Sequence, residues 1–210
     1  LLLGLLVCAA LIGAAALPAA AAGEAETHVI GVYYYDADGN SIKTDPVFGM
    51  ELSEYFGANL ANAQTVIDDI IGNADWLKAA RTEIRLFADV PEALTIPANT
   101  TTTLNLNGFA LSTAGGTAPL TVAAGGALTV TDTSADKSGS IAYTGSAAVS
   151  AVENHGRLTI ETANVTTASS AALIANSGET ARIAVKGGNF DTNGAGNFAN
   201  GAGARIAVSG

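Results

Sequence analysis

The acidic and basic side chains in the second half of the chain are the residues whose types could cleave a polysaccharide. Between residues 94 and 210 the acids are Asp132, Asp136, Glu153, Glu161, Glu179 and Asp191, and the bases are Lys137, Arg157, Arg182, Lys186 and Arg205. Elimination at a uronate needs clustered carboxylates that hold calcium and a base that takes the proton, whereas inverting hydrolysis needs two carboxylates flanking the bond. No two of these acids lie within two residues of each other. Their spacing therefore predicts no catalytic residue.

Two smaller features of this region invite a catalytic interpretation. Asp132 and Asp136 are the closest acidic pair, and a solvated turn over residues 131–137 explains them. His155, in Asn154-His155-Gly156, has the chemistry of a general base, but no acid–base partner is identifiable in the sequence. We interpret His155 as a turn residue.

Calcium sites are suggested at two places and fail at both. Asp36, Asp38 and Asn40 match the first ligand positions of a calcium loop, but Ser41 replaces the required Gly and Val47 replaces the bidentate Glu. The segment 187–191 is similar to a calcium-binding nonapeptide, yet Phe190 stands at its third Gly position and the motif is not repeated. We predict no metal ion and no cofactor.

Any such residue must be positioned by a repeat that fills the last two-fifths of the chain. Its apolar triplets are Leu128-Thr129-Val130, Leu158-Thr159-Ile160, Ile183-Ala184-Val185 and Ile206-Ala207-Val208, with first residues 30, 25 and 23 positions apart. A second apolar column, Val122, Val152, Ile174 and Phe198, recurs at intervals of 30, 22 and 24. Such a period is typical of stacked coils that bury their apolar faces against one another.

Within each triplet the outer two residues share a face and are expected to point inward. The predicted structural ladder consists of Leu128, Val130, Leu158, Ile160, Ile183, Val185, Ile206 and Val208, together with Asn154, Asn176 and Asn200. We interpret the three asparagines as turn residues that hydrogen-bond from coil to coil, since Asn tolerates left-handed backbone. Stacking leaves one enzyme hypothesis open, because it could bring Glu153, Glu179 and Arg182 near each other.

The N-terminal residues predict export. Residues 1–22 carry no charge and end in Ala19-Ala20-Ala21-Ala22, which is typical of a secretory signal cleaved near Ala22; a retained transmembrane anchor is the alternative. Cys8, the only cysteine, lies inside this segment, so the mature chain has no disulfide. All 19 acidic and 9 basic residues follow it and give a net charge of −10, which disfavours nucleic acid and anionic lipid as partners.

Residues 23–82 predict an α/β region. Thr27 to Tyr35 and residues 41–43 flank Asp38-Gly39, which indicates a strand, a tight turn and a strand over residues 29–43. Apolar residues spaced by three and four predict a helix over residues 61–80. This helix either caps the first coil, whose open end would expose strand edges, or belongs with the hairpin in a separate small domain.

Five segments between residues 83 and 190 resemble coils of a known group of proteins. They are residues 83–90, 94–98, 103–111, 126–134 and 154–160, and Leu104-Asn105-Leu106-Asn107-Gly108 is the most specific of their motifs. They look like right-handed parallel β-helix modules of exported bacterial cell-surface proteins, which share the pectate-lyase-like fold with polysaccharide lyases and hydrolases. The resemblance implies a mainly β chain with a β-helix over residues 83–210, and a secreted or wall-associated location. The apolar triplet Ile206-Ala207-Val208 predicts that the β-helix continues beyond Gly210.

We therefore expect a non-catalytic stalk or adhesion module of a larger surface protein. Its partners would be the cell wall, an extracellular glycan or a host surface, with no nucleic acid and no membrane after signal cleavage. The alternative is a carbohydrate-active enzyme, a polysaccharide lyase or hydrolase, whose active residues lie partly outside this sequence.

Overall fold

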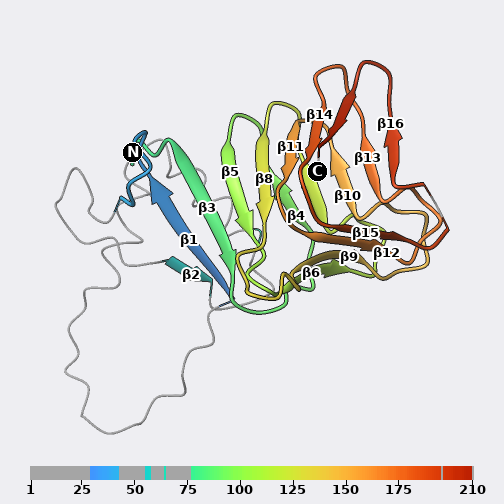
Figure 1. The fold of residues 1–210 in the computed structure, drawn as a ribbon, viewed down its shortest axis with the longest axis horizontal. Coiled ribbons are helices and arrows are strands. Elements are labelled where there is room, and N and C mark those ends of the chain that lie inside the picture. The colour runs from blue at the N-terminus through green and yellow to red at the C-terminus, as the bar shows by residue number, and fades with distance from the viewer. Residues whose placement is uncertain (1–28, 43–54, 58–63, 65–76, 195, 210) are drawn as a thin grey trace, which may run out of the picture.

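The computed structural model of the chain describes residues 29–42, 55–57, 64, 77–194 and 196–209 (Figure 1). Within these residues the secondary structure is almost entirely β-strand, and the strands form three sheets. The long sheet contains, in order of pairing, β17 (Arg205–Val208), β14 (Arg182–Val185), β11 (Arg157–Ile160), β8 (Ala127–Thr131), β5 (Thr101–Asn105), β3 (Arg81–Leu86), β1 (Ile30–Tyr35) and β2 (Tyr55–Gly57). The five-stranded sheet contains β16 (Phe198–Asn200), β13 (Ile174–Asn176), β10 (Val152–Asn154), β7 (Leu120–Val122) and β4 (Leu94–Ile96). The four-stranded sheet contains β15 (Asn189–Thr192), β12 (Asn164–Thr167), β9 (Ser140–Tyr143) and β6 (Ala110–Thr113).

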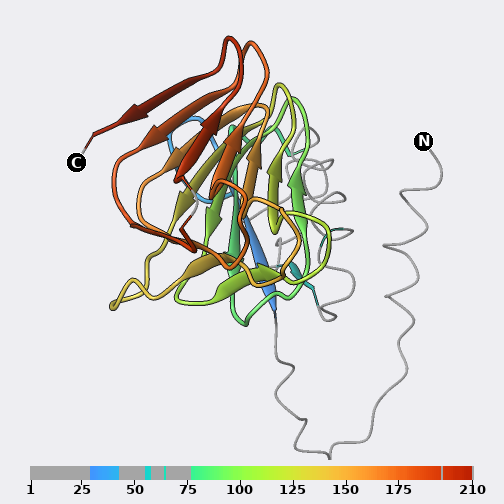
Figure 2. The same ribbon diagram turned by 90° about the vertical axis from the view of Figure 1, so that its right-hand side faces the viewer.

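From β4 onward the chain visits the three sheets in a constant order. Each circuit adds one strand to the five-stranded sheet, then one to the long sheet, then one to the four-stranded sheet, and successive circuits pair in parallel. Circuits begin at residues 94, 120, 152, 174 and 198. Figures 1 and 2 show the strands of each sheet following one another along the stack. The prediction of a mainly β chain built from stacked parallel units is confirmed.

The residues of the predicted ladder lie in two columns of the long sheet. Leu128, Leu158, Ile183 and Ile206 are mutual partners in neighbouring strands, as are Val130, Ile160, Val185 and Val208. Six of the eight are buried, whereas Ile206 is half-buried and Val208 is 69% exposed on β17, at the end of this sheet. Each fully buried side chain of this kind contributes about 1.5–3 kcal/mol to folding before the entropy cost is counted.

In the second predicted column, Val122 lies two residues away from the position that pairs with the other members. Val152 pairs with Leu120, not with Val122, and Val122 pairs with Asn154. Because residues i and i+2 of a strand share a face, the apolar pattern alone could not distinguish these two registers. The two columns of the five-stranded sheet are Leu94, Leu120, Val152, Ile174 and Phe198, and Ile96, Val122, Asn154, Asn176 and Asn200.

The long sheet ends in an antiparallel region. β1 pairs antiparallel with β3, and β2 pairs antiparallel with β1 on its other side. After β1 the chain turns tightly, with the Asp36 carboxylate accepting the N–H groups of Asp38 and Asn40 at 3.0 and 2.8 Å. Gly39 has the positive φ of 84° that such a turn requires, and Ser41 bridges back to Tyr35. This turn agrees with the tight turn expected at Asp38-Gly39.

The predicted helix over residues 61–80 is not supported. Residues 61–63 and 65–76 lie outside the described residues, as do residues 1–22. Leu77 and Lys78 form a turn in which Lys78 has a φ of 53°. The Gln64 carboxamide does meet the edge strand β4, since its Nε2 donates to the Thr95 carbonyl at 3.1 Å and its Oε1 accepts the Thr95 N–H at 2.6 Å. This side chain occupies backbone groups that an edge strand would otherwise expose. In the described part of the chain no helix is long and apolar enough to cross a membrane.

Candidate functional site

The corner between the five-stranded sheet and the long sheet is held by a buried asparagine ladder. Asn154 Nδ2 donates to Asn176 Oδ1, and Asn176 Nδ2 donates to Asn200 Oδ1, both at 2.7 Å. Asn154 and Asn176 are 0% and 1% exposed, so their amides need these partners. The three residues end β10, β13 and β16, and none has a positive φ. Their expected role as left-handed turn residues is therefore wrong, although they do bond from circuit to circuit.

The ladder also fixes where the next strands of the long sheet begin. Asn154 Nδ2 donates to the Arg182 carbonyl at 3.1 Å, and Asn176 Nδ2 donates to the Arg205 carbonyl at 3.2 Å. Backbone packing at the corner is close as well, because a Cβ on Gly156 would collide with the carbonyl oxygens of Gly126 and Ala123. A rigid corner of this kind holds side chains on its outer surface in fixed positions.

An open groove of about 790 Å³ runs across this corner and contains His155. Its lining residues are Thr121, Ala123, Ala124, His155, Ser177, Gly178, Glu179 and Thr180. Ser177 Oγ and His155 Nδ1 share a hydrogen bond of 2.9 Å between successive circuits. A hydroxyl beside an imidazole is the beginning of a nucleophile–base arrangement, which also needs a third group to orient the base. Sequence reasoning missed Ser177 because 22 residues separate it from His155.

The structure does not bring Glu153, Glu179 and Arg182 together as an acid–base cluster. Arg182 Nη1 donates to three main-chain carbonyls, those of Glu179 at 3.0 Å, Ala181 at 2.7 Å and Gly203 at 3.3 Å. Among the described residues no ion pair joins Arg182 to a carboxylate, and no group of three or more His, Cys, Asp or Glu side chains is placed to hold a metal ion.

The interpretation of Asp132 as a solvated turn residue is wrong. Its carboxylate is 1% exposed and accepts the N–H groups of Gly108, Ser134 and Gly139 at 3.0, 2.9 and 2.6 Å. Burial acts to raise the pKa of Asp132, but these hydrogen bonds outweigh it and hold the pKa below its usual value. Asp132 therefore anchors a loop, whereas Asp136 is exposed and bonds Ser138.

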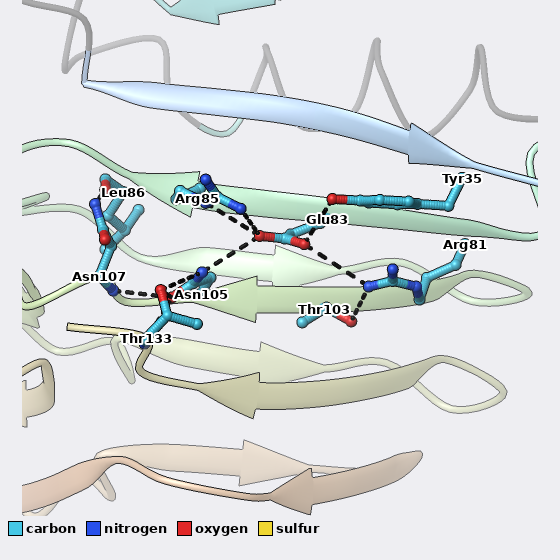
Figure 3. Close-up of polar contacts among 9 residues, drawn as sticks. All are labelled: Tyr35, Arg81, Glu83, Arg85, Leu86, Thr103, Asn105, Asn107 and Thr133. Carbon is cyan, nitrogen blue, oxygen red and sulfur yellow. Dashed lines mark hydrogen bonds and ion pairs between the residues drawn. The ribbon is translucent and has the colours of Figure 1, made fainter. Parts of the chain in front are cut away.

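A second polar centre, also missed from the sequence, lies where the antiparallel strands meet the parallel ones (Figure 3). Glu83 Oε1 accepts hydrogen bonds from Arg85 Nη2 at 2.7 Å and from Asn105 Nδ2 at 3.3 Å. Glu83 Oε2 accepts a hydrogen bond from Tyr35 Oη at 3.1 Å and lies 3.8 Å from Arg81 Nη1. The guanidinium groups of Arg81 and Arg85 stack on the rings of Tyr35 and Tyr33. The sequence did carry a signal for this centre. Arg81, Glu83 and Arg85 alternate along one strand, and residues two apart in a strand share a face.

Burial shapes the electrostatics of this centre. The Glu83 side chain is 9% exposed. Its burial acts to raise its pKa, but hydrogen bonds from Arg85 and Asn105 and the charge of Arg85 outweigh that effect and leave the pKa lowered. The pKa of Tyr35 is raised, first by burial and then by the Glu83 charge. The arrangement joins β1, β3 and β5 with partners for every charge.

Comparisons with protein-family models, with curated proteins and with solved structures found no match to this chain.

Proposed function

We infer that this chain is a non-catalytic structural or adhesion module of an exported bacterial surface protein, folded as a right-handed parallel β-helix of the pectate-lyase-like kind. The observation that carries the proposal is the internal use of its buried polar groups. The Asn154–Asn176–Asn200 amides bond one another, Asp132 bonds three backbone N–H groups, and Glu83 is paired with two arginines. Groups engaged in this way stabilise a scaffold and are not available to a substrate.

The location rests on the sequence alone. An uncharged segment over residues 1–22 with a small-residue border supports secretion, and a cysteine-free mature chain of net charge −10 suits an extracellular or wall-associated module. Its partners would be the cell wall, an extracellular glycan or a host surface. Nucleic acid, and the membrane after signal cleavage, are not proposed as partners.

One observation favours a second function. The contact between Ser177 and His155, which both line an open groove, is the feature that a hydrolase acting on a polysaccharide, or on its ester substituents, would use. In that case His155 would take the Ser177 proton, and Glu179 in the same groove would have to move to orient the imidazole.

A turnover assay distinguishes the two functions. The purified chain is incubated with isolated cell walls and with soluble neutral, acidic and acetylated polysaccharides, and the products are followed as new reducing ends, unsaturated ends and released acetate. The proposal expects no product above that of heat-unfolded chain, from the wild type or from the variants His155→Ala and Ser177→Ala. Product formation by the wild type that both substitutions abolish would establish the hydrolase instead.

A further inference from the structure

Three of the five arginines of the chain occupy one row on the outer face of the long sheet. Arg157 pairs in register with Arg182, and Arg182 pairs with Arg205, so the row crosses β11, β14 and β17. Each is the first residue of its strand, and the neighbouring residues Leu158, Ile183 and Ile206 point to the opposite face. Adjacent backbones in a sheet lie about 4.8 Å apart, so the row is a regular line of positive charge along the stack.

Among the described residues, this arginine row has no carboxylate partner. The ion pairs of the described residues join Glu83 to Arg81 and Arg85, and Glu161 to Lys186, and none involves the row. The next outward positions along the same strands are the neutral Thr159, Ala184 and Ala207. Like charges on directly opposite strand positions destabilise a sheet. In a chain of net charge −10, a row of cations that pairs with no described carboxylate is therefore best explained by an anion from outside.

The backbone of the row and the side chain of Arg182 are also held in place before any ligand arrives. Three main-chain carbonyls fix Arg182 Nη1, and the asparagine ladder bonds the carbonyls of Arg182 and Arg205. Arg157 and Arg205 remain exposed. The strand pairing therefore fixes the spacing of the three arginines, and the Arg182 side chain loses less conformational entropy on binding than a free surface side chain would.

A second groove, of about 590 Å³, begins at Arg157 and extends toward earlier circuits. Its lining residues are Asn99, Thr100, Thr101, Gly125, Gly126, Ala127, Gly156, Arg157 and Thr180. Hydroxyl and amide groups of this kind hydrogen-bond sugar hydroxyls. Stacking on nucleic-acid bases requires aromatic rings, and none lines this groove. The surface therefore suits an anionic glycan better than a nucleic acid.

We propose that the arginine row binds a linear sulfated polysaccharide that lies along the stack and continues into the second groove. This proposal rests on the surface-module function above and names its ligand. The strand spacing is close to the length that one pyranose residue adds to an extended glycan, so successive arginines face successive sugars. All three cations are guanidinium groups, which are weakly hydrated and fork-shaped. Sulfate esters are likewise weakly hydrated anions, whereas carboxylates hold water more tightly.

Affinity electrophoresis and titration calorimetry of the purified chain test the proposal, with dextran sulfate as the probe and unsulfated dextran, polygalacturonate and single-stranded DNA as comparisons. The test variant is Arg157→Gln with Arg205→Gln, because both side chains are exposed and their loss should leave the fold intact. Its control is Lys137→Gln with Lys186→Gln, which removes the same charge away from the row. A third variant, Arg157→Lys with Arg205→Lys, keeps the charge and removes the fork, and thermal unfolding of each variant verifies folding.

We expect dextran sulfate to bind the wild type, with salt weakening the complex, and dextran not to bind. The glutamine pair should weaken binding roughly tenfold, the lysine pair to a smaller extent, and the control pair hardly at all. Equal losses in the glutamine pair and its control would overturn the row as the site, and equal or tighter binding of polygalacturonate or DNA would overturn the sulfated ligand. Both of these results concern binding and not catalysis. They would therefore leave the surface-module function standing, and only product formation in the turnover assay would overturn it.

Discussion

At the β1 end of the long sheet, charged and aromatic side chains join antiparallel strands, whereas from β8 to β17 apolar columns and neutral amides join parallel ones. The first region depends on residues that occur once, such as Glu83 between Arg81 and Arg85. The second places apolar side chains at the same strand positions in successive circuits, and asparagines join three of those circuits. A repeated contact distributes stability along the stack, whereas a single centre concentrates it at one junction. Substitutions in the two regions should therefore differ in size and in what they disrupt.

The largest effect is expected from a charge placed in the repeated core. Ile183 is 2% exposed between Leu158 and Ile206, so Ile183→Asp buries a carboxylate without a partner. We expect a loss of at least about 4 kcal/mol in the free energy of unfolding, measured by denaturant titration. The control is Ala184→Asp, one residue along and on the outward face, which should cost far less. Similar losses in both variants would mean that the column does not face inward.

At the antiparallel junction we expect an intermediate effect from Glu83→Gln. The substitution keeps the shape but leaves Arg81 and Arg85 without their counter-charge, and should cost about 2 kcal/mol at neutral pH. Hydrogen exchange should rise first in β1 and β3, while β11 and β14 stay protected. Glu161→Gln, which removes only the exposed pair with Lys186, should change stability by less than about 0.5 kcal/mol. Uniform loss of protection along the whole stack would contradict the contrast between the regions.

In the ladder itself we expect a smaller loss. Asn176→Ala leaves Asn200 Oδ1 without its donor and removes the acceptor for one of the three hydrogen bonds of Asn154 Nδ2. The cost should be about 1–2 kcal/mol in the free energy of unfolding. Asn193→Ala, which removes one exposed hydrogen bond to the Ala168 carbonyl, is the matched control and should be nearly neutral. Equal stability of the two variants would show that the ladder does not hold the corner.

The sequence predicted the repeated region far better than the unique one, for a physical reason. Apolar triplets such as Leu158-Thr159-Ile160 need only alternation and a neighbour, and both are visible in a single chain. The pairing of Val122 with Asn154 was missed, because positions two apart in a strand share a face and only the register decides between them. The Glu83 centre and the Ser177–His155 contact join residues 48 and 22 positions apart, which only the register can reveal.

Lowering the pH should give the smallest of these effects and should act through the buried carboxylates of both regions. The lowered pKa values of Glu83 and Asp132 mean that each carboxylate contributes stability above its ordinary pKa and loses it as the pH falls through the folded-state value. The raised pKa of Tyr35 acts in the opposite sense, since its contribution is complete below the usual tyrosine pKa and is lost as the pH rises through the folded-state value.

Unfolding free energies measured from neutral to acidic pH should fall less steeply in Glu83→Gln and in Asp132→Asn than in the wild type. The Asn176→Ala variant should instead run parallel to the wild type, because its amide does not titrate. If the Glu83→Gln curve also ran parallel, the junction would not depend on the Glu83 charge, and the contrast between the charged junction and the neutral asparagine ladder would fail.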